Sequence, residues 1–175
     1  QAYFDVEFVI DESSSMEDNS KGTTNDPERY RIEAAKNFTT GLIAGDRAAV
    51  VGFNDTARRK IALSEDMDAV RAAIDSIVGN AGGTALYEGL EEAIDELLAT
   101  YDETRGRFII ALTDGEDSAS NDEAYDNIIA TCVEHGIPIY TIGLGTSVNT
   151  NLLTKLANYT GGAYFNIRSA EDLPQ

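Results

Sequence analysis

Apolar residues along this chain occur either in short runs, some of them interrupted by charged residues, or at the three- and four-residue spacing of a helix. The runs predict strands at residues 3–10, 47–53, 58–63, 106–112, 137–143 and 163–167. The helical spacing predicts helices at residues 28–44, 66–78, 85–99, 122–135 and 149–159. Strands and helices alternate along most of the chain, which is the pattern of an α/β domain.

Most of the predicted strands are apolar at nearly every position, and strands of that kind are buried on both sides. We therefore expect a doubly wound, mostly parallel sheet of six strands with helices on both faces, a Rossmann-like fold. The strands at 47–53 and 58–63 are joined only by the turn at residues 54–56, which predicts a hairpin with one antiparallel edge strand. Residues 1–175 are expected to form a single domain, excised from a larger protein because a core strand starts almost at Gln1.

The net charge of the chain limits the classes of partner that we expect it to bind. Its 13 basic and 31 acidic residues give a formal net charge of -18. Such a surface repels phosphate backbones and anionic membranes, so no nucleic-acid partner is expected. It suits cations or calcium-rich surroundings. No apolar stretch approaches the roughly 20 residues of a membrane-spanning helix, so this domain is not expected to insert into a membrane.

The single cysteine and the single histidine argue against common catalytic sites. One cysteine, Cys132, excludes an internal disulfide and a thiolate zinc site of the usual kind. We expect it on the inner face of helix 122–135 together with Ile128, Ile129 and Val133. His135 falls in the last turn of that helix, where an imidazole can interact with the helix dipole. A Ser-His-Asp triad would have to use His135, and the protein is therefore not expected to be an enzyme.

Oxygen-bearing side chains occur at three places in the loops of the predicted fold, and two of these places directly follow strands. Asp11, Ser13 and Ser15 come directly after strand 3–10, and Asp114 follows strand 106–112. Thr84 ends a glycine-rich loop at the start of helix 85–99. Ligands of open parallel sheets bind outside the carboxyl ends of the strands. Two carboxylates and three hydroxyls are hard oxygen donors, so they predict a site for Mg²⁺, with Mn²⁺ and Ca²⁺ as alternatives.

Each of these signals has a simpler interpretation when it is taken alone. Asp114-Gly115 is a common turn, and Thr84 is most simply a helix N-cap. The glycines at 143 and 145 follow a strand, but Val148 stands where a dinucleotide fingerprint needs its third glycine. The conjunction of donors at three strand edges is what favours a metal site.

The motifs that carry these donors resemble those of the von Willebrand factor type A domain, the fold shared with integrin inserted domains. The matching segments are residues 9–16 (Val-Ile-Asp-Glu-Ser-Ser-Ser-Met), 82–86 (Gly-Gly-Thr-Ala-Leu) and 112–116 (Leu-Thr-Asp-Gly-Glu). The resemblance covers essentially the whole chain. It implies a metal-ion-dependent adhesion site in which Ser13, Ser15 and Thr84 bind the cation, with Asp11 and Asp114 bound directly or through water. It also implies the strand order 3-2-1-4-5-6.

The chain departs from that family pattern at positions that are not ligands. Glu12 stands where an apolar or small residue is usual, and Ser14 stands where glycine is usual. Residues 17–26 form a long polar segment that we interpret as a solvated loop, with shaping of the ligand surface as the alternative. Its Asp18, Asn19 and Asp26, together with Asp117, are a weak candidate for a second cation site. Residues 169–172 resemble a capping box that opens a further helix.

The sequence therefore predicts divalent-cation-dependent binding of a protein or glycan partner, in which a carboxylate of the partner completes the metal shell. We expect an adhesive module, extracellular or at the cell surface. The alternative is a cytoplasmic interaction module of a metal-chelatase or AAA-linked complex. Metal-dependent hydrolysis is disfavoured because no general base stands out near the predicted cation: Glu116 is the only candidate, and we interpret it as a solvated loop charge.

Overall fold

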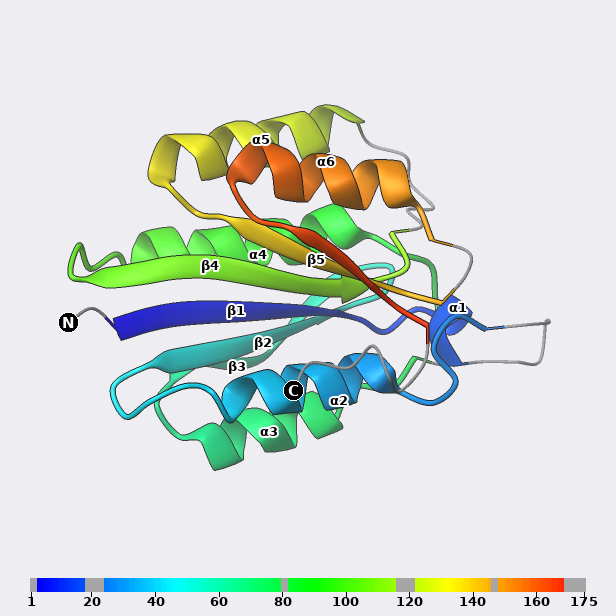
Figure 1. Ribbon diagram of the computed structural model, residues 1–175, viewed down its shortest axis with the longest axis horizontal. Helices are drawn as coiled ribbons and strands as arrows, with labels where there is room; N and C mark the ends of the chain where they lie inside the picture. Colours follow the sequence, from blue (N-terminus) through cyan, green and yellow to red (C-terminus); the bar gives the residue numbers. More distant parts are fainter. Residues whose placement is uncertain (1–2, 18–23, 80–81, 116–121, 146–147, 169–175) are drawn as a thin grey trace.

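The computed structural model describes residues 3–17, 24–79, 82–115, 122–145 and 148–168 (Figure 1). Its elements, in chain order, are β1 (Tyr3–Asp11), α1 (Ser14–Glu17), α2 (Tyr30–Thr39), β2 (Arg47–Phe53), β3 (Ala57–Ser64), α3 (Met67–Asp75), α4 (Leu86–Ala99), β4 (Arg105–Thr113), α5 (Asp122–His135), β5 (Ile139–Leu144), α6 (Thr150–Thr160) and β6 (Tyr164–Ile167). The helix predicted to open at Ser169 lies outside the described residues.

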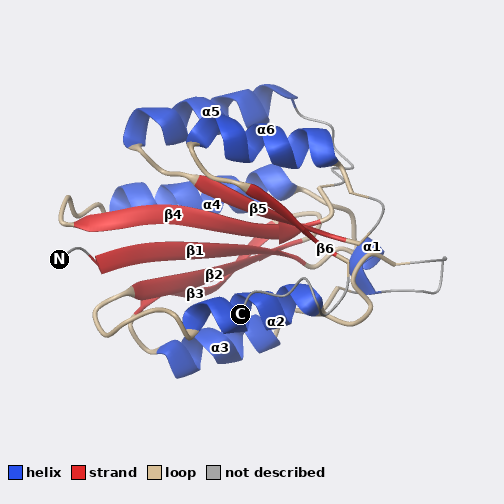
Figure 2. Ribbon diagram, viewed as in Figure 1, coloured by secondary structure: helices blue, strands red, loops and turns tan. Residues whose placement is uncertain are grey.

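The strands form one six-stranded sheet with the order β3-β2-β1-β4-β5-β6. Every pair is parallel except β2 with β3, which confirms both the expected strand order and the antiparallel edge hairpin. Helices α4, α5 and α6 cover one face of the sheet, and α2 and α3 cover the other (Figure 2). The predicted doubly wound α/β fold is therefore confirmed.

Alternating side chains of β1 feed two separate apolar cores. Val6, Phe8 and Ile10 point toward α2 and α3, whereas Val9 packs under α4. All of these side chains are fully buried, so the central strand is covered on both faces, as its largely apolar run predicts.

Helix α4 approaches the sheet closely at Gly89. A Cβ at this position would lie 2.8 Å from Cγ1 of Val9 and 3.1 Å from the ring of Phe53. The absence of a side chain at residue 89 thus lets α4 pack directly on β1 and β2. This packing fixes the amino end of α4, which follows the loop that carries Thr84.

The helix predicted at residues 28–44 is shorter than expected. Helix α2 begins after Arg29, whose φ of 59° is left-handed, and it ends at Thr39. The apolar spacing continues through Leu42 and Ile43, but Asp46 closes the following residues into a loop. Its carboxylate accepts hydrogen bonds of 2.9 Å from the backbone N–H groups of Phe4 and Ile43. One local and one long-range hydrogen bond to Asp46 therefore accompany the loop that replaces the predicted last turn of the helix.

Helix α5 matches its expected bounds, but one inward assignment is wrong. Cys132 is fully buried, and burial raises the pKa of its thiol to about 12, so it is a structural thiol as expected. Val133, the next residue, is 59% exposed. Adjacent helical positions differ by about 100° around the axis, so Cys132 and Val133 face different directions.

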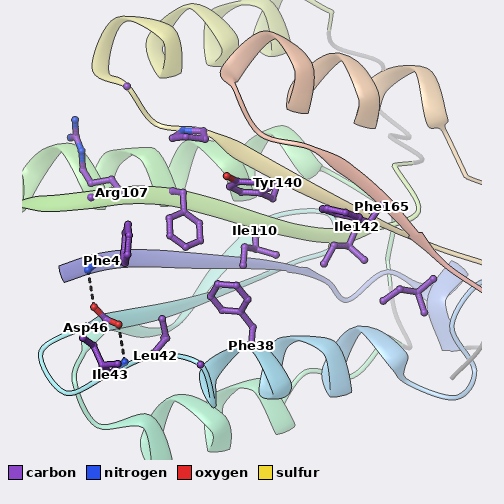
Figure 3. Close-up of a pocket in the computed structure, with 16 residues that line it drawn as sticks. Phe4, Phe38, Leu42, Ile43, Asp46, Arg107, Ile110, Tyr140, Ile142 and Phe165 are labelled. Carbon is purple, nitrogen blue, oxygen red and sulfur yellow. Dashed lines mark hydrogen bonds between the residues drawn. The ribbon is translucent and has the colours of Figure 1, made fainter. Parts of the chain in front are cut away.

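The α2 face of the sheet leaves β4, β5 and β6 partly uncovered, which creates an apolar groove of about 1000 Å³ (Figure 3). Phe108 lies at its centre, with the rings of Phe4, Phe38 and Tyr140 packed edge-on at centroid distances of 5.7, 5.9 and 5.7 Å. Within the described residues, no helix combines the length and the apolarity needed to cross a membrane.

Candidate metal centre

The carboxyl ends of β1 and β4 bring two of the predicted ligands, Asp11 and Asp114, to one edge of the sheet. The two strands are parallel neighbours with Ile10 opposite Leu112, so Asp11 and Asp114 both follow at this edge. Both side chains are fully buried. Helix α1 lies beyond the same edge, where the β1 and β4 arrows end (Figure 1).

The two serines join the aspartates in one hydrogen-bonded chain. Ser13 donates to Oδ1 of Asp11 through its backbone N–H at 2.7 Å and through its hydroxyl at 2.5 Å. The hydroxyls of Ser13 and Ser15 lie 3.0 Å apart. Ser15 in turn donates to Oδ2 of Asp114 at 2.7 Å. The short helix α1, which the sequence did not predict, turns the chain so that Ser15 reaches Asp114 across 99 residues of sequence.

Thr84 is held in a loop beside the serines. The backbone N–H and the hydroxyl of Ser14 point to the carbonyl oxygen of Gly82 at 3.4 and 3.3 Å. On the other side, Gly83 N–H donates to Oδ1 of Asp55 at 2.7 Å, in the hairpin turn. Thr84 is 5% exposed, and the N-cap of α4 is Ala85, so the simple capping interpretation of Thr84 is wrong.

Two further residues bind the buried aspartates directly, and the sequence did not single them out. Thr113 donates from Oγ1 to Oδ2 of Asp11 at 2.6 Å and accepts from Gly115 N–H at 3.0 Å. Asn25 donates from Nδ2 to Oδ2 of Asp114 at 2.9 Å. Thr113 lies within the Thr113-Asp114-Gly115 motif, which could have identified it. Asn25 follows no strand and carries no comparable signal.

The end of the polar segment 17–26 is not solvated, contrary to expectation. Asp26 is 1% exposed, and its carboxylate accepts from the backbone N–H groups of Tyr30 and Arg31 at the start of α2. It also accepts from Nη1 of Arg31 at 2.7 Å. Asp26 is therefore committed to an arginine rather than to a second cation site. The other candidates for that site, Asp18, Asn19 and Asp117, lie outside the described residues.

Glu12 is directed away from the predicted ligands. Its carboxylate, which is 6% exposed, pairs with Nζ of Lys60 at 3.0 Å and with Nη2 of Arg58 at 3.4 Å, both on β3. This unusual residue of the motif therefore ties the end of β1 to the edge hairpin.

The electrostatics of the site suit a cation. Burial, followed by the like charge of Asp114, raises the pKa of Asp11 to about 6, although hydrogen bonds from Ser13 and Thr113 oppose the shift. The described residues contain no group of three or more His, Cys, Asp or Glu side chains placed to hold a metal ion. Among the described residues, the side-chain oxygens that the hydrogen bonds join at this edge belong to the carboxylates of Asp11 and Asp114 and to the hydroxyls of Ser13, Ser15 and Thr113. Such a set of hard oxygens fits Mg²⁺ or a similar ion.

Comparison with known proteins places the chain in a family. The family described as von Willebrand factor type A domain matches residues 5–175. Calcium-activated chloride channel regulator 1 of Bos taurus is 31% identical over 168 residues, which cover 90% of this chain. The same alignment spans only 16% of the length of the bovine regulator.

Solved structures agree with this assignment. The von Willebrand factor type A structure from Catenulispora acidiphila has a TM-score of 0.80 at 23% identity, covering 98% of this chain and 40% of that chain, which shows a common fold. Proximal thread matrix protein 1 of the mussel byssus has a TM-score of 0.76 at 25% identity, covering 94% of this chain and 41% of that chain. That structure has zinc in its MIDAS (metal-ion-dependent adhesion site) motif. The resemblance seen in the sequence is thus confirmed, and the chain belongs to the von Willebrand factor type A domain family.

Proposed function

We propose that this domain binds a divalent cation through Asp11, Ser13, Ser15, Thr84 and Asp114, and that it binds a protein or glycan partner through that cation. The observation that carries the proposal is the continuous hydrogen-bonded chain from Asp11 through Ser13 and Ser15 to Asp114. Four side chains from two distant segments already converge on one point. The mussel byssus relative, with zinc in its MIDAS motif, supports metal binding at the corresponding place.

The charged and the neutral residues have different roles at the proposed site. Asp11 and Asp114 provide negative charge in a buried setting, where attraction to a cation is weakly screened. Ser13, Ser15 and Thr84 provide neutral oxygens, which leave much of the positive charge of a bound cation uncancelled. The cation supplies a coordination position for an oxygen of the partner, such as a carboxylate. This local attraction offsets the repulsion that a domain of net charge -18 exerts on an acidic partner.

The donor set favours Mg²⁺, with Mn²⁺ and Ca²⁺ as alternatives. Hydroxyls and carboxylates are hard oxygens, and neither the buried Cys132 nor His135 contributes a softer ligand. The carbonyl oxygen of His135 accepts from Nη2 of Arg107, near the amino end of β4, whereas Asp114 follows its carboxyl end. The histidine thus lies at the opposite end of the sheet.

Calorimetry tests the metal site. Chelator-stripped protein is titrated separately with Mg²⁺, Mn²⁺ and Ca²⁺, and the double variant Ser13→Ala/Ser15→Ala is titrated in parallel. Ser76→Ala is the matched control, because the hydroxyl of Ser76 is exposed and donates to the nearby carbonyl of Ala73. We expect saturable binding by the wild type and the control, and a loss of roughly tenfold or more in the double variant. Equal binding by the double variant would contradict the assigned ligands.

Partner binding is tested with peptides of known chemistry. Immobilised peptides that contain one Asp or Glu are compared with the same peptides carrying Asn or Gln. We expect retention of the domain only on the acidic peptides, only with divalent cation, and with competition by soluble acetate. Retention that survives excess chelator unchanged would refute a cation-mediated mechanism.

We infer an interaction module rather than an enzyme, placed outside the cell or at its surface. The membership of the family and the likeness to a byssus matrix protein support this role. An intracellular module of an ATPase-linked complex is the alternative. The complete reading frame of the parent protein distinguishes the two, because a secretory signal or anchor supports the first and an ATPase domain the second. The wild type is assayed for phosphoester and peptide hydrolysis with added Mg²⁺, alongside Asp114→Ala. We expect no turnover by the wild type beyond that of the variant. Turnover that Asp114→Ala abolishes would instead indicate an enzyme.

A further inference from the structure

Arg31, in the first turn of α2, has a fully buried side chain directly behind the candidate metal centre. Its Nε donates to the main-chain oxygen of Asp11 at 2.8 Å. Its Nη1 donates to Oδ2 of Asp26 at 2.7 Å, and its Nη2 donates to Oε2 of Glu17. Each nitrogen of the guanidinium therefore has a partner, and the three partners belong to three different segments.

The two carboxylates explain why an arginine can be buried here. The Asp26 side chain is fully buried, and that of Glu17 is 16% exposed. Glu17 also pairs with Nη1 of the partly exposed Arg29 at 2.8 Å, so two carboxylates compensate the buried Arg31 and the Arg29 beside it. Glu17 also accepts from the backbone N–H of Gly79 at 2.7 Å. A Cβ at Gly79 would lie 2.9 Å from Nη2 of Arg31, so the backbone there approaches the guanidinium closely. The cluster thus joins α1, α2 and the segment after α3.

The contact with Asp11 fixes a single peptide unit at both ends. The N–H of Glu12 donates to the carbonyl oxygen of Phe53 on β2 at 2.7 Å. The carbonyl of the same peptide unit, that of Asp11, is held by Arg31 from the other side. The plane of this peptide sets the direction in which β1 enters the Ser13–Ser15 turn, and with it the placement of the Asp11 carboxylate.

We propose that Arg31 is a positioning residue of the metal centre: by holding the carbonyl of Asp11 against the Glu17–Asp26 cluster, it keeps Asp11, Ser13 and Ser15 in the arrangement that binds a cation. This inference deepens the proposed function and rests on it. A lysine cannot replace this arginine, because one ammonium group cannot donate along the three fixed directions of a guanidinium.

The test compares two arginines that contact opposite ends of β1: Arg31 at Asp11 and Arg105 at Asp5. Arg105 donates from Nε to Oδ1 of Asp5 at 2.8 Å and from Nη2 to the carbonyl of Gly45, at the amino ends of β1 and β4. Arg31→Lys and Arg105→Lys are prepared, and folding is verified by circular dichroism. Mn²⁺ binding is then measured by calorimetry, and the hydration of bound Mn²⁺ by water-proton relaxation.

We expect Arg31→Lys to weaken Mn²⁺ binding by roughly tenfold or more and to change the relaxation of the bound ion. Arg105→Lys should change the affinity by less than about twofold, although it also breaks a partly buried ion pair. Wild-type affinity in a folded Arg31→Lys variant would overturn the inference. An equal loss in Arg105→Lys would also overturn it, because general loosening of the sheet would then explain both.

A readout without metal separates this inference from the proposed function. In chelator-stripped protein, Arg31→Lys should shift the amide resonances of Glu12, Ser13 and Ser15, whereas Arg105→Lys should leave them in place. If wild-type protein binds no cation while these shifts occur, the proposed function fails and the positioning contact stands.

If Arg31→Lys does not fold, Asp26→Asn replaces it. Asp26→Asn removes one anchor of the guanidinium, and an unchanged Mn²⁺ affinity in that variant would refute the inference.

Discussion

Thr113 Oγ1 lies 2.6 Å from Oδ2 of Asp11, although 102 residues separate the two along the chain. The parallel pairing of β1 with β4 brings them together at the carboxyl edge of the sheet. Since Ser13 occupies the other carboxylate oxygen, the Asp11 side chain is held from both sides by hydroxyl donors. These two hydrogen bonds restrain the rotamer of Asp11.

Thr113→Val should lower cation affinity roughly tenfold while the fold is kept, because valine has nearly the same shape but cannot donate to Asp11. Loss of a hydrogen bond to a charged group should also lower the free energy of unfolding by about 1.5–3 kcal/mol. Calorimetry and urea unfolding measure the two effects. Thr104→Val is the control, because its hydroxyl donates to Oδ1 of Asp102 at 2.6 Å on the exposed surface. An equal loss of affinity in both variants would contradict the role of Thr113.

Cation removal should lower the stability of the wild-type domain. A cation that binds only the folded state adds about 2.7 kcal/mol to the free energy of unfolding when its concentration is ~100 times its Kd. For a domain of this size, that corresponds to a rise in Tm of about 5–10 °C. Differential scanning calorimetry with Mg²⁺ and with excess chelator measures the difference. The Ser13→Ala/Ser15→Ala variant should show little or no difference, and a full Mg²⁺ effect in that variant would place the cation elsewhere.

Glu7 should make stability fall as the pH rises. Burial, reinforced by a hydrogen bond with Glu96, raises the pKa of Glu7 to about 10, against the opposing influence of Arg59. The folded state thus keeps a proton that the unfolded chain releases near 4.5. The stabilisation is complete below the unfolded pKa and is lost as the pH rises toward the folded one, by up to about 1.4 kcal/mol per unit.

Urea unfolding at about pH 6 and about pH 9 measures this dependence. Glu7→Gln mimics the protonated side chain and should flatten the decline in the free energy of unfolding relative to wild type. Glu103→Gln, on the exposed surface, should leave the decline as it is. A decline of the same steepness in Glu7→Gln would show that Glu7 does not carry the effect.

Gly89→Ala should destabilise the domain even though alanine favours helices by about 1 kcal/mol over glycine. The added Cβ would lie 2.8 Å from Cγ1 of Val9, so α4 would have to move away from β1. Overpacking of this kind costs about 1–3 kcal/mol, which outweighs the gain in propensity. Urea unfolding measures the change. Gly41→Ala is the control, because the nearest atom to its added Cβ lies at an ordinary 3.5 Å, and stability should change little.

The sequence by itself determined the fold class and the order of its elements. Largely apolar runs such as residues 3–10, in which only Asp5 and Glu7 are charged, are satisfied by burial on both faces, and this requirement is written locally in the chain. The same local logic placed Asp11 and Asp114 at strand ends and so at one edge of the sheet. The helix predicted at residues 28–44 was too long, because the apolar spacing of Leu42 and Ile43 carries no information about the hydrogen bonds that the Asp46 carboxylate accepts.

Only the tertiary structure decided which polar groups support the predicted ligands. The bonds from Arg31 to Asp11, from Asn25 to Asp114 and from Thr113 to Asp11 join segments 20, 89 and 102 residues apart. A periodic pattern reports whether a residue is buried, because burial depends on the element around it. It does not report the partner of a buried polar group, because that partner is chosen by how the elements pack against one another.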